Sequence, residues 1–227
     1  MTRIIDTSLA VLKWPVALLA VAMLPALLTS LVVLLQDFVG DAQAMAPFTL
    51  GLLGYAAVWA LLLRRRVFGS LLSTLEHEFS HALFAWLTLH HVSGLRASWS
   101  KGGSIKVHGG DNWLITAAPY FFPTISVGLM LVAFWIPEHW RLYFNLVLGG
   151  SLAYHLSSTV LELHPKQPDL RELGLPFVII FVPSANLLWA SIVLAYAQGG
   201  LSASGTYLCH LFETSLTQLR GLVAVLS

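Results

Sequence analysis

The chain has 227 residues, of which 57% are hydrophobic and only 10% are charged, and its formal net charge at pH 7 is +1. With a mean hydropathy of +0.77, this composition is far from that of a soluble domain, where charged residues make up about 25%. It predicts an integral membrane protein. A nearly neutral chain gives no reason to expect a nucleic-acid or nucleotide partner. The single cysteine, Cys209, excludes an internal disulfide and a cysteine-based zinc site.

Long apolar stretches recur along the chain. A helix that crosses the hydrocarbon core of a bilayer needs about 20 apolar residues, and we identify about six such stretches. They cover residues 15–36, 47–63, 67–92, 113–136, 140–163 and 175–197. Residues 206–227 form a shorter, mixed segment that suits either an interfacial helix or a seventh span. The predicted fold class is an all-α, multi-pass membrane protein in one domain, 1–227, whose core covers about 67–197.

Basic residues near the N-terminus and after the second stretch predict the orientation. Arginines occupy positions 64–66, and short loops rich in arginine face the cytoplasm. Together with Arg3 and Lys13, they place the N-terminus in the cytoplasm. The first apolar stretch is longer than the core of a typical signal peptide, so we expect an uncleaved first span.

The third stretch contains the pattern His-Glu-x-x-His at residues 77–81. On a helix, His77 and His81 are four residues apart and therefore lie on one face, where both can bind a single zinc ion. Glu78 then lies beside the metal, where it can take a proton from a water activated by the zinc and pass it to a leaving amine. Polar groups inside an apolar span should face the interior of the helix bundle and pair with one another or with an ion.

A catalytic zinc site with two histidines needs a third protein ligand and one open position. Asp169 lies in the segment 165–176, where prolines interrupt the helical pattern. Such irregular backbone can carry a carboxylate to membrane depth if it lines a cavity. The residue types alone leave several candidates, which are His155, Glu162, His164, Asp169 and Glu172.

A polar segment follows the third stretch. Residues 95–108 alternate around Lys101, Gly102 and Gly103, which predicts a small β-hairpin within about 93–110, directly after the metal-binding helix. An exposed strand edge at this place could hold an extended peptide as an added strand. A simple polar connector is the alternative interpretation.

Three pieces of the chain carry a family resemblance. They are residues 77–83 with the His-Glu-x-x-His pattern, Asn112 with the Pro-Tyr-Phe-Phe-Pro run at 119–123, and Pro168-Asp169 with the Leu-Gly-Leu-Pro run at 173–176. In these pieces the chain resembles the site-2 protease class of intramembrane zinc metallopeptidases, the M50 family, and most closely its M50B branch. The resemblance covers about 75–176.

This resemblance implies a site and an activity. One zinc ion would be held by His77, His81 and Asp169, with Glu78 as general base and acid. Asn112 would contact substrate, although a cap on the helix that begins after it is an equally good interpretation. Many relatives carry Asp-Gly where this chain has Asp169 followed by leucine. The resemblance further implies a hydrolase of a bacterial inner membrane that cuts peptide bonds in or next to transmembrane segments of membrane proteins.

Three other interpretations remain open at this point. One is a membrane zincin that acts at the membrane surface with Glu162 or Glu172 as third ligand. Another is a membrane di-iron hydroxylase, because His77 and His81 followed by the histidines at 90–91 are faintly similar to its histidine boxes. The last is a non-catalytic relative that only binds membrane helices, and the intact Glu78 argues against it.

Overall fold

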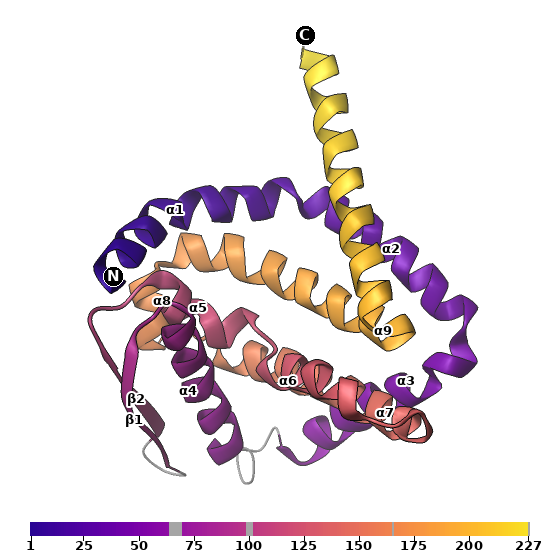
Figure 1. The fold of residues 1–227 in the computed structure, drawn as a ribbon, viewed down its shortest axis with the longest axis horizontal. Helices are drawn as coiled ribbons and strands as arrows, with labels where there is room; N and C mark the ends of the chain where they lie inside the picture. Colours follow the sequence, from indigo (N-terminus) through magenta and orange to yellow (C-terminus); the bar gives the residue numbers. More distant parts are fainter. Residues whose placement is uncertain (64–69, 99–101, 165, 227) are drawn as a thin grey trace.

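The computed structural model describes residues 1–63, 70–98, 102–164 and 166–226, most of which form helices (Figure 1). The arginines at 64–66 that predict the orientation lie outside the described residues, as does the tip of the predicted hairpin at 99–101.

The first three helices wrap around the outside of the molecule. Helices α1 (Thr2–Ala22) and α2 (Leu24–Gly40) pack along the long helix α9 (Leu175–Leu226), and α3 (Ala42–Leu61) packs against α7 (Arg141–Glu162) (Figure 1). The predicted span 15–36 is wrong in its bounds, because Met23 separates α1 from α2. Pro25 near the start of α2 lacks a backbone N–H and cannot continue the preceding helix.

Fewer helices than expected have the length and composition of a membrane span. Three of the described helices meet both requirements, namely Thr2–Ala22, Ala42–Leu61 and Leu175–Val225. A bent pair, α5 (Trp113–Phe121) with the helical segment Thr124–Trp135, makes a fourth if it is counted as one span, although it turns by 78°. The predicted count of six is not confirmed. Helices α4 (Ser70–Leu87) and α7 are absent from these candidates because their polar side chains lower their hydropathy.

A two-stranded antiparallel sheet follows α4, as predicted. Strand β1 (His91–Ser98) pairs with β2 (Gly102–His108), with an irregularity between Val92 and Gly94. The predicted third span was expected to reach residue 92, but the chain has already entered β1 there. Gly102 and Gly103, expected in the turn, belong to β2, where Gly103 lies opposite Ala97.

Short helices and breaks shape the second half of the chain. Helix α6 (Thr124–Val132) begins after Pro123 and leads through the 3₁₀ turns η2 (Ala133–Trp135) and η3 (Glu138–Trp140) into α7. Helix α8 (Pro168–Leu173) ends at Gly174, whose φ of +82° lies in the left-handed region that favours glycine. Helix α9 is kinked at Gly199 and Gly200.

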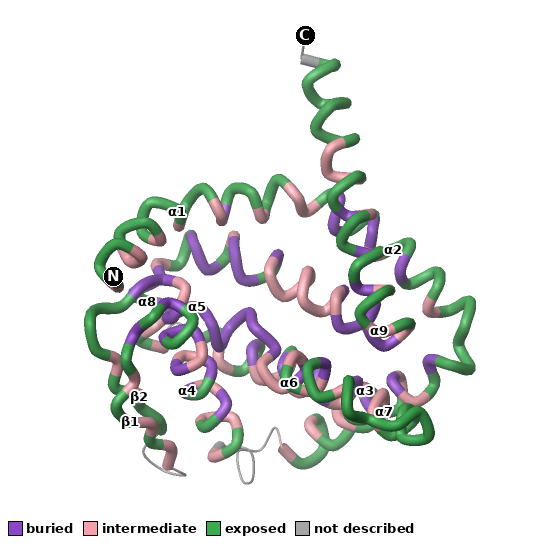
Figure 2. Tube along the Cα trace, in the orientation of Figure 1, coloured by how far each residue is buried: buried purple, intermediate pink, exposed green. Residues whose placement is uncertain are grey.

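The C-terminal part of α9 leaves the body of the molecule, and most of its residues are exposed (Figure 2). Residues 206–226 are helical, and their position at an interface or in a seventh span stays a prediction.

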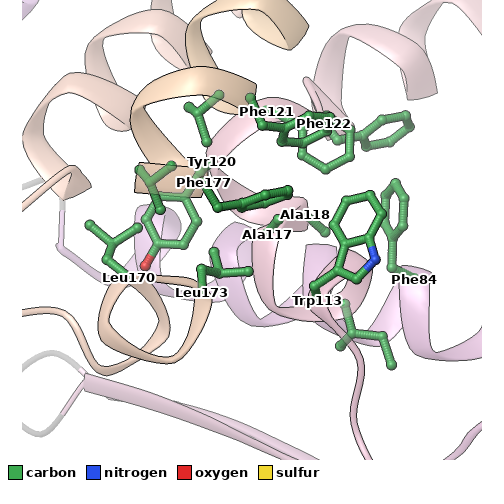
Figure 3. Close-up of a cluster of buried hydrophobic side chains, with 14 of the residues drawn as sticks. Phe84, Trp113, Ala117, Ala118, Tyr120, Phe121, Phe122, Leu170, Leu173 and Phe177 are labelled. Atoms are coloured by element: carbon green, nitrogen blue, oxygen red, sulfur yellow. The ribbon is translucent and has the colours of Figure 1, made fainter. Parts of the chain in front are cut away.

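An aromatic core joins the elements around the His-Glu-x-x-His helix. Phe84 of α4 packs edge to face against Phe121 of α5, and Trp113 of α5 packs edge to face against Phe177 of α9. Phe181 of α9 contacts both Phe121 and Phe177 and so joins the two pairs. Figure 3 shows Leu170 and Leu173 of α8 beside Tyr120 and Phe177. The short helix α8 is therefore fixed by burial of its two leucines against this core.

We expect the α3–α7 contact to depend on Gly51. A Cβ at Gly51 would overlap the backbone carbonyl of Leu146 in α7, whereas a Cβ at Gly54 of the same helix meets nothing within 4 Å. Gly51→Ala should therefore destabilise the protein by about 1–3 kcal/mol through overpacking. Gly54→Ala should be neutral or stabilising by up to about 1 kcal/mol, because alanine favours the helix. Thermal unfolding midpoints in detergent test this, and equal midpoints for the two variants would contradict it.

Candidate metal centre

Three potential ligand atoms converge between α4 and α8. Nε2 of His77 lies 3.2 Å from Nε2 of His81, and Oδ2 of Asp169 lies 3.3 Å from each of them. The helical spacing places both imidazole rings on one face of α4. Helix α8 brings the carboxylate to them from a segment 92 residues away from His77 in sequence. The atoms form a nearly equilateral triangle.

The hydrogen bonds behind the two rings fix where their protons sit. Nδ1 of His81 lies 2.8 Å from the carbonyl oxygen of Ile115. A carbonyl only accepts, so Nδ1 of His81 donates and Nε2 of the neutral ring carries a lone pair. Nδ1 of His77 donates in the same way to Oε2 of Glu162 at 2.7 Å. When both rings are neutral, two nitrogen lone pairs and a carboxylate oxygen thus point at one another, an arrangement that a cation at their centre makes favourable.

The size of the triangle fits zinc. Zinc binds histidine nitrogen at about 2.0–2.1 Å in tetrahedral geometry, which separates neighbouring ligand atoms by about 3.3 Å. The observed separations of 3.2 and 3.3 Å match that value. Two imidazoles and a carboxylate are also a ligand set typical of catalytic zinc, with one tetrahedral position left open. The role of His77, His81 and Asp169 as zinc ligands stays a prediction that this geometry supports.

Glu162 lies behind the ring of His77, whereas the alternative ligand set would require it at the third corner of the triangle. Its Oε2 accepts from His77 on the side of the ring away from the triangle, and its Oε1 accepts from Ser73 at 2.7 Å and from Ser158 at 2.9 Å. A carboxylate held in this way fixes the orientation of the ring and raises the basicity of its other nitrogen. Sequence reasoning missed this arrangement, because nothing local in the chain indicates that Ser73, Ser158 and Glu162 meet.

His155 and His164 lie apart from the triangle, whereas Glu172 lines the same cavity without belonging to the group that could hold an ion. Nε2 of His155 donates to Oδ1 of Asn186 at 2.9 Å, inside the helix bundle. His164 is exposed, and its Nδ1 accepts from the backbone N–H of Lys166 at 3.1 Å. Among the described residues, the group close enough to hold one ion is His77, His81 and Asp169.

Asp169 is held in its ionised form. The hydroxyl of Tyr120 donates to its Oδ2 at 3.0 Å, and the same oxygen faces both imidazoles. Burial alone would raise the pKa of Asp169, but when no metal is bound the rings of His77 and His81 can carry a proton at Nε2 and donate to Oδ2, which holds that pKa below the usual range for aspartate. A carboxylate must be deprotonated to bind a metal, so this environment suits a ligand.

A cavity of about 880 Å³ opens onto the triangle. Its lining includes the whole His-Glu-His-Asp set, namely His77, Glu78, His81 and Asp169, together with the β2 residues Gly102, Gly103, Ser104, Ile105 and Val107. Strand β2 lies so close to α4 here that a Cβ at Gly103 would overlap the side chain of Glu78. The carboxylate of Glu78 and strand β2 therefore face the same space.

Asn112 caps a helix. Its side-chain oxygen accepts from the backbone N–H groups of Leu114 and Ile115 at 3.2 Å each, at the start of α5. Its side-chain nitrogen donates to Oδ1 of Asp6 at 2.9 Å. Asn112 is not among the described residues that line the cavity. The cap interpretation thus accounts for both ends of its amide, and a contact between Asn112 and substrate stays a prediction.

The protein combines apolar helices long enough to cross a membrane with two histidines and an aspartate that could hold one metal ion. This combination is that of a membrane protein with a candidate metallopeptidase centre. The family described as Peptidase M50B-like matches residues 49–161, and the chain belongs to this family. The predicted resemblance to the M50B branch is confirmed, and membership indicates a membrane metallopeptidase of a zinc-dependent family. The match includes α4 and the hairpin, whereas α1 and α8 lie outside it. No curated protein and no solved structure gives a significant match to the chain.

We expect Glu162→Gln to weaken zinc binding by about 10–100-fold, the usual effect of losing a carboxylate partner of a metal-binding histidine. Glutamine still accepts a hydrogen bond from His77 but has no charge to raise the basicity of the ring. Competition with a chelator of known affinity measures the change. Glu213→Gln, at an exposed position on α9, is the matched control and should bind zinc like the wild type. Equal affinities for both variants would show that Glu162 has no such role.

Proposed function

We propose that this protein is an intramembrane zinc metalloprotease that hydrolyses peptide bonds in or next to transmembrane segments of membrane proteins. The observation that carries this proposal is the convergence of His77, His81 and Asp169 on one point beside the cavity that Glu78 lines. Family membership supports the peptidase activity, and the apolar helices support the membrane setting.

Each residue of the centre has a role in this proposal. His77, His81 and Asp169 hold the metal, and Glu162 and the carbonyl of Ile115 keep the two rings in the required orientation. Zinc bound there would polarise the scissile carbonyl and lower the pKa of a water molecule. The carboxylate of Glu78 accepts a proton from the attacking water and delivers it to the nitrogen of the leaving amine.

The hairpin is the proposed substrate platform. In the described part of the sheet, β2 pairs only with β1, so its other edge is available to an extended segment. A transmembrane helix satisfies its own backbone hydrogen bonds and must unwind before it can be cut. An unwound segment that adds to β2 regains those bonds along a strand that lines the cavity beside Glu78.

The alternative metal chemistry is less well supported. The di-iron interpretation needs further histidines near His77 and His81. Nε2 of His90 instead lies 3.2 Å from Oδ2 of Asp6, and its Nδ1 lies 3.0 Å from the hydroxyl of Thr88. His91 pairs with His108 across the hairpin. These contacts favour a single metal ion over a di-iron site.

Glu78→Gln should abolish cleavage and preserve zinc binding, because the amide cannot accept a proton but the metal-binding residues are unchanged. The variant and the wild type are co-expressed with a single-span membrane substrate, and the zinc content of the purified proteins is measured in parallel. Undiminished cleavage by Glu78→Gln would falsify the mechanism. Loss of both zinc binding and activity would mean that Glu78 is needed to hold the metal and not only to transfer a proton.

Gly103→Ala should lower kcat at unchanged zinc content, because its Cβ displaces the side chain of Glu78. Gly94→Ala is the matched control in the same hairpin, since a Cβ at Gly94 meets nothing within 4 Å. The cleavage rates of the two variants are measured with the same substrate. They show whether a methyl group next to Glu78 has an effect that a methyl group in open space does not have. If Gly103→Ala is as active as Gly94→Ala, the contact between β2 and Glu78 has no part in catalysis.

A further inference from the structure

Lys13 is a charged residue in the middle of the apolar helix α1, and its side chain turns into the protein. Its ammonium group donates to the backbone carbonyl of Leu173 at 2.8 Å and lies 5.0 Å from the centre of the Phe177 ring. A charge within a membrane-spanning helix is costly unless it is paired, so an inward lysine of this kind has a specific partner. The partner here is the end of α8.

Helix α8 needs an external partner at this end. The last carbonyl groups of a helix have no partner within it, and a cation close to them is favourable. Leu173 is the final residue of α8, and the chain turns away at Gly174. Asp169 lies four residues earlier, one helical turn from the carbonyl that Lys13 holds. A helix of only six residues moves as a unit, so fixing its end fixes Asp169.

Helix α1 is itself anchored to the elements around the candidate metal centre. Asp6 accepts from the side chain of Asn112, and the carbonyl of Leu9 accepts from Nε1 of Trp113 at 2.6 Å. Asp6, Leu9 and Lys13 are spaced to lie on one face of α1. This face links α1 to the start of α5, whose Ile115 orients His81. It also links α1 to α8, which carries Asp169.

We propose that Lys13 is a positioning residue that holds Asp169 against the two histidines by binding the C-terminal end of α8. The proposal rests on the zinc site of the proposed function. It assigns a task to α1, which lies outside the residues that match the family.

The test is the zinc affinity of the purified full chain in detergent, measured by competition with a chelator. Lys13→Met removes the donor but keeps the length of the side chain, and should lower the affinity by about 10-fold or more. Lys13→Arg keeps a cationic donor and should restore most of the affinity. Arg3→Met removes a cation from an exposed position of the same helix and should leave the affinity unchanged.

A second comparison shows whether Lys13 acts through Asp169. If it does, Lys13→Met should have no further effect on zinc affinity in an Asp169→Asn background, because the effects of coupled residues are not additive. An equal loss in both backgrounds, or a Lys13→Met protein with wild-type affinity, would overturn the proposal. If Lys13→Met does not fold, Lys13→Gln, whose amide is too short to replace the ammonium, takes its place with the same expected loss. A wild-type chain that binds no zinc would instead overturn the proposed function and this inference together.

Discussion

Two imidazole lone pairs and a carboxylate oxygen meet within 3.3 Å of one another in this protein, and each is held in place from behind by a different element. Glu162 of α7 holds His77, Ile115 of α5 holds His81, and α8 carries Asp169. With no metal ion or proton between them, these acceptors would repel one another. The packing of four helical elements brings them together all the same, and a bound metal would convert the repulsion into attraction.

Polar residues in the apolar helices lie where two elements share them. Ser80 of α4 lies 2.6 Å from the hydroxyl of Thr124 on α6, and Ser126 of α6 lies 2.9 Å from the hydroxyl of Ser151 on α7. A buried polar group that is paired costs little, whereas the same group facing lipid costs several kcal/mol by rough estimate. The polar residues that lower the hydropathy of α4 and α7 below that of a simple span thus contribute to the contacts that hold the bundle together.

Local patterns predicted the parts of the site that depend on short spacing. His77 and His81 share a helical face, and alternation indicated the hairpin. Glu162 stayed ambiguous, because its role as the partner of His77 depends on a contact over 85 residues. Lys13 was read only as an orientation signal, and its contact with α8 spans 160 residues. Span boundaries failed for a related reason, since hydropathy does not report which polar residues find partners inside the protein.

The two histidines of the candidate centre are positioned by local helix geometry, whereas the position of Asp169 depends on tertiary structure. Helix α4 sets the two histidines by its own geometry, but α8 has too few residues to be stable as an isolated helix. Its position follows from the burial of Leu170 and Leu173 in the aromatic core and from the contact with Lys13 (Figure 3). Small changes in the packing of α1 or α9 would therefore move Asp169 while leaving the histidines in place. Of the three proposed ligands, the aspartate is thus the one through which the rest of the fold can control metal binding.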